Sequence, residues 1–360
     1  MSHYRQPWIY SKWVDGLFII APPFVVLLII AFFPDLFLGN NYVTPTAWII
    51  LVLGIDVSHV YSTLFRTYFD VAARNKYRNA FLFVPVGCLI AGVLLHSIDH
   101  MLFWRCLAYL AVFHFIRQQY GFMRLYSRKE NNAIWKRRMD AIMVYTTMLY
   151  PIVYWHFSGD RNFTWFVEGD FLLFNKKEMI LNVSLILYFI IAFVFLMTEI
   201  RAIIQHKVIN IPKLSIISGT ALSWYFGIVY FNGDLTFTAL NVVAHGIPYM
   251  ALVWIYGNKQ SSKNQDKPFW SRLIFKPAAI ILYLLPLLLL AFLEEGIWDA
   301  MVWQDHRQLF NGFYALPVLH DKTLLSVMVP LLSLPQVTHY VLDGFIWKVS
   351  RPDVKAEMGI

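Results

Sequence analysis

The chain has 360 residues, of which 58% are hydrophobic and only 14% are charged. Soluble domains carry about 25% charged residues, so this chain has too few charges to cover a soluble protein of its length. The same composition excludes intrinsic disorder, and two cysteines, Cys88 and Cys106, exclude a disulfide scaffold. The class that remains is a multi-pass membrane protein, and 18% aromatic residues suit interfacial belts and a pocket for a bulky apolar ligand.

Apolar stretches of about 20 residues predict membrane-spanning helices. The chain has ten of them, and we expect one all-α transmembrane domain over residues 1–360. The first stretch has no small-residue cleavage site behind it, which favours a retained helix over a signal peptide. The predicted spans are residues 15–36, 46–68, 80–98, 101–123, 140–157, 178–199, 213–231, 235–257, 274–292 and 323–347.

The basic residues predict the orientation of these spans. Of the 30 Lys and Arg residues, 23 lie at the two termini, in every second loop or at the span ends beside those loops. Six lie in or beside the alternate loops, and Arg117 lies in the interior of a span. This alternation predicts that both termini are cytoplasmic, in a multi-pass protein of a bacterial inner membrane. The net charge of +8 is then a consequence of topology, and we expect no nucleic-acid binding.

Four histidines lie inside predicted spans that all run from the outside to the inside: His59, His114, His245 and His339. In each case the first basic residue beyond the cytoplasmic end of the span follows 7 to 14 residues later, which places the four imidazoles at a similar depth. Ionisable groups at membrane depth are costly, so each of them is a candidate functional residue.

Each of these histidines shares a helical face with a second polar group three or four residues away. The arrangement predicts a metal site with four histidine ligands, and Asp343, Tyr249 and Gln118 as candidate catalytic groups. The alternatives to a metal site are a proton or ion relay formed by the same residues, and polar side chains that pack without a shared function. Asp343 is either a fifth ligand or the partner of an arginine, Arg66 or Arg117. The pairs are Asp56 with His59, Gln118 with His114, Asn241 and Tyr249 with His245, and Asp343 with His339.

The other histidines are expected to be solvated. His96 and His100 have the HxxxH spacing of membrane desaturases, but they fall in a short outer turn and no HxxHH segment accompanies them. We interpret both as turn residues. The remaining histidines lie in loops or at span ends, namely His3, His156, His206, His306 and His320.

All-imidazole ligation suits iron, copper or zinc. The sequence lacks an HExxH motif and the paired histidines of membrane haem proteins, so non-haem iron is the first choice, with copper or zinc as alternatives. Asp56 or Asp343 could balance the charge of the metal. A site among membrane lipids implies a lipophilic substrate and O2. No dinucleotide-binding loop is present, so any electrons would come from a separate donor. A transporter or proton-coupled carrier is the competing class.

The four histidine segments resemble those of the Brp/Blh-type bacterial β-carotene dioxygenases. The resemblance implies an integral membrane fold, a four-histidine non-haem iron, and a carotenoid, an isoprenoid or another lipid as substrate. The chain has Tyr249 where the third family segment has a second histidine. The segments that carry the resemblance are VSHVYST around His59, FHFIRQQYG around His114, VVAHGIPYMALVW around His245 and LPQVTHYVLDGFIWK around His339.

Overall fold

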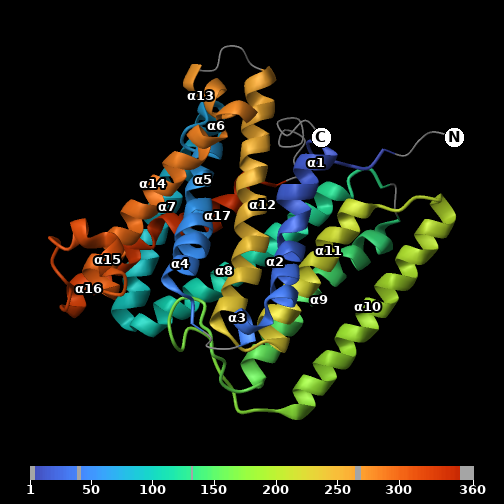
Figure 1. The fold of residues 1–360 in the computed structure, drawn as a ribbon, viewed down its shortest axis with the longest axis horizontal. Helices are drawn as coiled ribbons and strands as arrows, with labels where there is room; N and C mark the ends of the chain where they lie inside the picture. The colour runs from blue at the N-terminus through green and yellow to red at the C-terminus, as the bar shows by residue number, and fades with distance from the viewer. Residues whose placement is uncertain (1–4, 39–41, 131–132, 264–268, 349–360) are drawn as a thin grey trace. The chain divides into compact units, whose positions relative to one another are not determined.

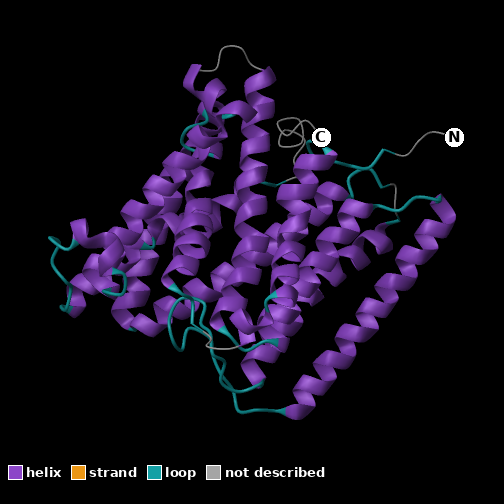
Figure 2. Cartoon of the chain, in the orientation of Figure 1, coloured by secondary structure: helices purple, strands orange, loops and turns teal. Residues whose placement is uncertain are grey.

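The computed structural model describes the chain except for residues 1–4, 39–41, 131–132, 264–268 and 349–360. Every regular element in this described part is a helix, and Figure 2 shows helices and loops alone. A helix satisfies the backbone hydrogen bonds of an apolar segment internally, which a single strand does not. The predicted all-α class is therefore confirmed for the described residues.

The chain divides into two compact units. Unit 1 comprises Met1–Tyr42 and Val112–Pro248, and unit 2 comprises Val43–Ala111 and Tyr249–Ile360. The boundaries fall inside two long helices, α8 (His100–Tyr126) and α12 (Asp234–Lys263), so each of these helices contributes to both units. The prediction of one domain over residues 1–360 stays a prediction.

Unit 1 is built on α9, which packs against α10 and α11. α11 also packs against α2. Besides its parts of α8 and α12, unit 1 contains α1 (Lys12–Asp15), η1 (Gly16–Ile20), α2 (Ala21–Phe32), α3 (Pro34–Leu38), α9 (Ile134–Phe157), α10 (Glu178–His206), α11 (Ile211–Trp224) and η3 (Tyr225–Tyr230), as Figure 1 shows.

A buried ion-pair cluster joins α9, α10 and α11 of unit 1 near their ends. Lys213 of α11 lies 2.8 Å from Glu199 of α10 and 3.7 Å from Asp140 of α9, and Lys136 of α9 contacts both of these acids. Glu130, in the loop before α9, lies 3.0 Å from Lys213. Charges buried this deeply are stable only when they are paired, so the cluster fixes the ends of α9, α10 and α11 relative to one another.

Unit 2 has α7 packed against α16 and α17, and α14 packed against α5 and η2. Its helices are α4 (Pro45–Trp48), η2 (Ile49–Val57), α5 (Ser58–Arg66), α6 (Val71–Lys76), α7 (Arg78–Ile98), α13 (Phe269–Ile274), η4 (Pro277–Ala279), α14 (Ile280–Trp298), η5 (Asp299–Trp303), α15 (Arg307–Phe310), η6 (Asn311–Phe313), α16 (Lys322–Leu332) and α17 (Leu334–Ile346) (Figure 1).

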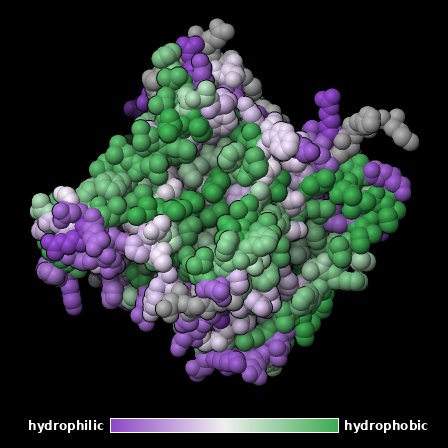
Figure 3. Space-filling view, viewed as in Figure 1, coloured by the Kyte–Doolittle hydropathy of each residue, from purple (hydrophilic) through white to green (hydrophobic). Residues whose placement is uncertain are grey.

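Within the described residues, six helical segments are long and apolar enough to cross a membrane, and α16 with α17, bent by 43°, qualify as a seventh if they form one span. Large apolar side chains are exposed along α10 of unit 1 and α14 of unit 2, where Figure 3 shows a hydrophobic surface in green. Such a surface is compatible with contact to lipid. The six segments are Lys12–Phe32, Pro45–Arg66, Arg78–Ile98, Glu178–His206, Asp234–Ser262 and Pro277–Trp303.

The other three predicted spans, residues 101–123, 140–157 and 213–231, are also helical in the structure, as α8, α9 and α11 with η3. They are not among the helices that qualify by length and apolar composition. The count of ten spans and the cytoplasmic position of both termini therefore stay predictions. The outermost terminal residues lie outside the described part of the chain.

Candidate metal centre

Unit 1 holds one pair of the predicted histidines. His114 comes from α8 and His245 from α12, and their ring centroids lie 5.0 Å apart with the planes inclined by 78°. His114 is 4% exposed and His245 is 1% exposed. The ring of Phe115 stacks on His245 at 3.6 Å, with the planes within 5° of parallel. This contact restrains the plane of the His245 ring, because a flat stack is lost when the imidazole tilts.

Pro248 explains how α12 presents His245. Proline has no N–H, so the carbonyl of Ala244, one turn earlier in the helix, lacks its usual donor. Gln119 of α8 replaces that donor, since its Nε2 donates to the Ala244 oxygen at 3.2 Å. The hydroxyl of Thr220 donates to Oε1 of Gln119 at 3.1 Å and so orients the amide. α12 therefore continues through Pro248 instead of breaking there.

Gln118 also contacts the backbone. Its Nε2 donates to the carbonyl of His245 at 2.9 Å. The sequence placed Gln118 on the same face as His114 and predicted a catalytic role; in the structure its amide nitrogen holds α12 against α8. Asn241, one turn before His245, donates to the carbonyl of Phe237 at 2.8 Å, and its Oδ1 is buried without a hydrogen-bond partner.

Unit 2 holds the other pair. His59 of α5 and His339 of α17 are each 1% exposed, and their ring centroids lie 5.1 Å apart at 80°. Tyr249, from the unit 2 part of α12, packs edge-on against both rings, at 5.9 Å from His59 and 4.9 Å from His339. Asp56 lies 3.7 Å from Nδ1 of His59.

A π-helical segment precedes His59. The element η2 ends at Val57, and the hydroxyl of Ser58 donates to the carbonyl of Leu53, five residues earlier, at 2.8 Å. Segments of π-helix are frequent at functional sites. Sequence periodicity does not reveal such a segment, because the apolar residues of η2 read equally well as ordinary α-helix.

Thr63 is the site residue that the sequence reasoning missed. Its Oγ1 lies 2.6 Å from Nδ1 of His339 and 2.8 Å from the hydroxyl of Tyr249. The Tyr249 hydroxyl in turn donates to Asp343 at 2.6 Å. Thr63 is four residues after His59 and so shares its helical face, which is the signal that could have identified it.

The two arginines proposed as partners of Asp343 lie in different units, and Arg66 is in the same unit as Asp343. Arg66 has no exposed surface, interacts electrostatically with Asp343, and lies 4.1 Å from the ring of Tyr256. Arg117 is in unit 1, where its Nη1 donates to the hydroxyl of Tyr145 at 2.8 Å.

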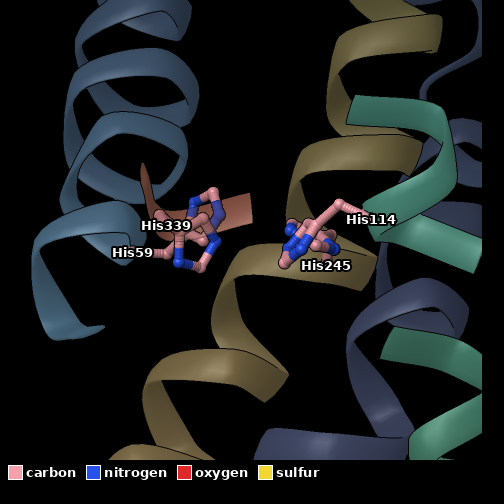
Figure 4. Close-up of side chains that lie close together, drawn as sticks. All are labelled: His59, His114, His245 and His339. Atoms are coloured by element: carbon pink, nitrogen blue, oxygen red, sulfur yellow. The ribbon is translucent and has the colours of Figure 1, made fainter. Parts of the chain in front are cut away.

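Figure 4 shows the four predicted histidines as two pairs of rings. Each histidine offers one ring nitrogen, and these nitrogens all lie within 4.8 Å of one another. A buried four-histidine group of this kind could hold a metal ion. His96 lies in the last turn of α7 and His100 is the first residue of α8, with ring centroids 6.4 Å apart. Both are therefore helical, and the turn that the sequence predicted is reduced to Asp99 between the two helices.

Comparison of the chain with protein-family models, with curated proteins and with solved structures finds no match. The resemblance to the Brp/Blh-type dioxygenases therefore stays a prediction that depends on the short histidine segments. The arguments that follow depend on the geometry of the site.

Proposed function

We propose that the chain is an integral-membrane, metal-dependent oxygenase that acts on a lipophilic substrate, with iron held by His59, His114, His245 and His339. The observation that carries the proposal is the convergence of four buried imidazole nitrogens within 4.8 Å. The donor set suits such a metal, because iron, copper and zinc all accept imidazole ligands. Iron and copper both activate O2, whereas zinc does not. Iron, the first choice from the sequence, is therefore retained, with copper as the alternative.

The surroundings of the histidines fit a metal that carries positive charge. Neutral imidazoles leave that charge unbalanced, and a buried charge is costly without compensation. Unit 2 supplies two carboxylates, Asp56 beside His59 and Asp343 beside His339, at 3.7 and 3.8 Å from the ring nitrogens. These distances are too long for hydrogen bonds, so the carboxylates act through charge.

The substrate class follows from the position of the histidines. All four are buried, and His245 packs against Phe115, which itself contacts Trp165 at 5.1 Å and Trp224 at 6.4 Å. A carotenoid, an isoprenoid or another lipid would dissolve among such side chains, as O2 does. The aromatic groups would orient the substrate and exclude water.

Metal analysis of the purified protein tests this proposal. We expect one iron per chain after anaerobic purification or reconstitution with Fe2+, and a loss of that iron in His339→Ala. His100→Ala is the matched control, because the side chain of His100 is 67% exposed and lies at the α7–α8 turn. If His339→Ala retains as much metal as His100→Ala, the four-histidine centre is wrong.

A proton-coupled or cation carrier is the second candidate, and the acids of unit 2 favour it. Glu294 of α14 is hydrogen-bonded to Tyr61, its Oε2 is buried without a hydrogen-bond partner, and it interacts electrostatically with Asp56. Intramembrane acids of this kind mark ion pathways. Flux of H+ in proteoliposomes that persists in metal-free protein and disappears in Glu294→Gln would favour the carrier over the oxygenase.

A further inference from the structure

Arg117 is an exposed charged residue in the middle of α8, on a face of unit 1 that also exposes large apolar side chains. It lies within the predicted span of residues 101–123. We propose that Arg117 forms a binding site for an anionic phospholipid and holds it through the phosphate of the headgroup. The proposal rests on the membrane location that is part of the proposed function, and it does not depend on the metal centre.

The positive charge of Arg117 is not balanced by an acid. Among the residues that the structure describes, its guanidinium contacts two tyrosines: Nη1 donates to the hydroxyl of Tyr145 at 2.8 Å, and the group lies 5.0 Å from the centre of the Tyr120 ring. A guanidinium has several N–H donors in a planar fork, so donors remain for a ligand. A phosphate matches both the fork and the charge.

The side chains on one side of Arg117 suit acyl chains. Phe113, one turn before Arg117 in α8, is 58% exposed, and Leu149, one turn after Tyr145 in α9, is 47% exposed. α8 and α9 are consecutive helices joined by a short loop, so they run antiparallel. Phe113 and Leu149 therefore lie on the same side of the hydrogen bond between Arg117 and Tyr145, where acyl chains would contact them.

The side chains on the other side of Arg117 suit a headgroup. The guanidinium lies against Tyr120, which is one turn nearer to the C-terminal end of α8, and Arg124 continues the same helical face. Tyrosine and arginine are residues that occupy the interface between a membrane and water. The face therefore has the polarity of a phospholipid, with a cationic and aromatic end and an apolar end.

The end of α8 that carries Arg124 is the end that the sequence predicts to be cytoplasmic. Anionic lipids give the cytoplasmic leaflet its negative surface potential, and basic sites between helices on this side bind anionic headgroups. An arginine without an ion pair is costly within a membrane. An anionic phospholipid removes that cost at Arg117, because its phosphate supplies the missing negative charge and its acyl chains cover the apolar side chains.

The test measures lipid binding by the full-length protein in detergent. Native mass spectrometry detects bound phosphatidylglycerol and bound phosphatidylcholine, and glycerol 3-phosphate is the probe for a headgroup without acyl chains. Arg117→Gln removes the charge. Arg307→Gln is the matched control, because Arg307 is also exposed and also lies 5.0 Å from the ring of a tyrosine, Tyr314, but belongs to unit 2.

We expect the wild type and Arg307→Gln to retain phosphatidylglycerol in preference to phosphatidylcholine. In Arg117→Gln the affinity for phosphatidylglycerol should fall by about tenfold or more, the usual effect of losing a hydrogen bond to a charged group. Equal affinities in the two variants would overturn the proposal and would indicate that Arg117 is simply hydrated. Binding of glycerol 3-phosphate as tight as that of phosphatidylglycerol would also overturn it, because the site would then bind a free anion.

Photocrosslinking decides the question if Arg117→Gln does not fold. Benzoylphenylalanine in place of Leu149 should cross-link to phosphatidylglycerol in preference to phosphatidylcholine. The same group in place of Ile281, an apolar position of α14 that is 69% exposed in unit 2, should show no such preference. No preference at Leu149 would overturn the proposal, and it would leave the metal centre, whose test is the iron content, untouched.

Discussion

Phe115 lies flat against His245, with the two ring centroids 3.6 Å apart and the ring planes inclined by 5°. Phe115 follows His114 directly in α8, so one helix supplies both a predicted ligand and the aromatic ring that orients the other predicted ligand of unit 1. The orientation of His245 is therefore tied to that of α8, and the stack predicts a measurable effect on metal binding.

Replacing Phe115 with Leu should weaken metal binding without removing a ligand. An aromatic pair contributes about 0.5–1.5 kcal/mol beyond its buried area, which corresponds to a two- to tenfold change in affinity. We expect that loss for Zn2+ measured by chelator competition. Phe113→Leu is the matched control, because Phe113 is 58% exposed in the same helix. Equal affinities in the two variants would show that the stack does not orient His245.

Gln119→Leu should destabilise unit 1 by about 1–3 kcal/mol, the cost of leaving a buried acceptor without a donor. The acceptor is the Ala244 carbonyl, to which Pro248 cannot donate a hydrogen bond because it has no N–H. In a Pro248→Ala background the helix regains its own N–H, so the same Gln119→Leu change should cost much less. The free energy of unfolding in detergent, measured for all four proteins of this double-mutant cycle, gives the coupling. Additive effects would contradict the compensation.

Lys213→Met should be strongly destabilising. The change removes one of the two lysines from a buried cluster that contains Glu199, Asp140 and Glu130, and breaking a buried ion pair costs about 3–5 kcal/mol. We expect a clear decrease of the unfolding midpoint in denaturant. Lys176→Met is the control, because Lys176 pairs with Glu178 at the surface, where such pairs contribute about 0–1 kcal/mol. A similar small effect of both changes would argue against a structural role for the cluster.

Gly257→Ala should disturb the packing of α12 in unit 2. A Cβ at this position would clash with the ring of Phe275, so the ring or the helix must move, at a cost of about 1–3 kcal/mol. Gly87→Ala in α7 is the control: a Cβ there meets no atom within 4 Å, and alanine is favoured over glycine inside a helix. A thermal unfolding midpoint that is lower only in Gly257→Ala is the expected result.

The sequence could predict that the four histidines lie close together, because their position depends on one coordinate, the depth along each helix. Basic residues mark the ends of the helices, and the distance from those ends places His59, His114, His245 and His339 at a common level. The structure brings the corresponding ring nitrogens within 4.8 Å. The helical class was predictable for a similar reason, since composition alone requires helices in an apolar environment.

The contacts around the histidines were not predictable in the same way. Gln118 shares a helical face with His114, but its amide binds the backbone of His245, because the side chain is long enough to reach the neighbouring helix. Thr63 carries no charge at membrane depth, and its one signal in the sequence is the four-residue spacing from His59. Asp140 and Glu199 lie at the ends of predicted spans, and their pairing with Lys213 depends on how α9, α10 and α11 pack.

X-ray absorption spectroscopy at the metal edge tests the central claim most directly, because it counts the ligands around the metal in the full-length protein. After loading with Fe2+ under anaerobic conditions, we expect a first coordination shell with four imidazole nitrogens, and three in His339→Ala if that variant still holds iron. A shell dominated by oxygen or sulfur ligands, or an unchanged imidazole number in His339→Ala, would contradict the proposed four-histidine metal centre.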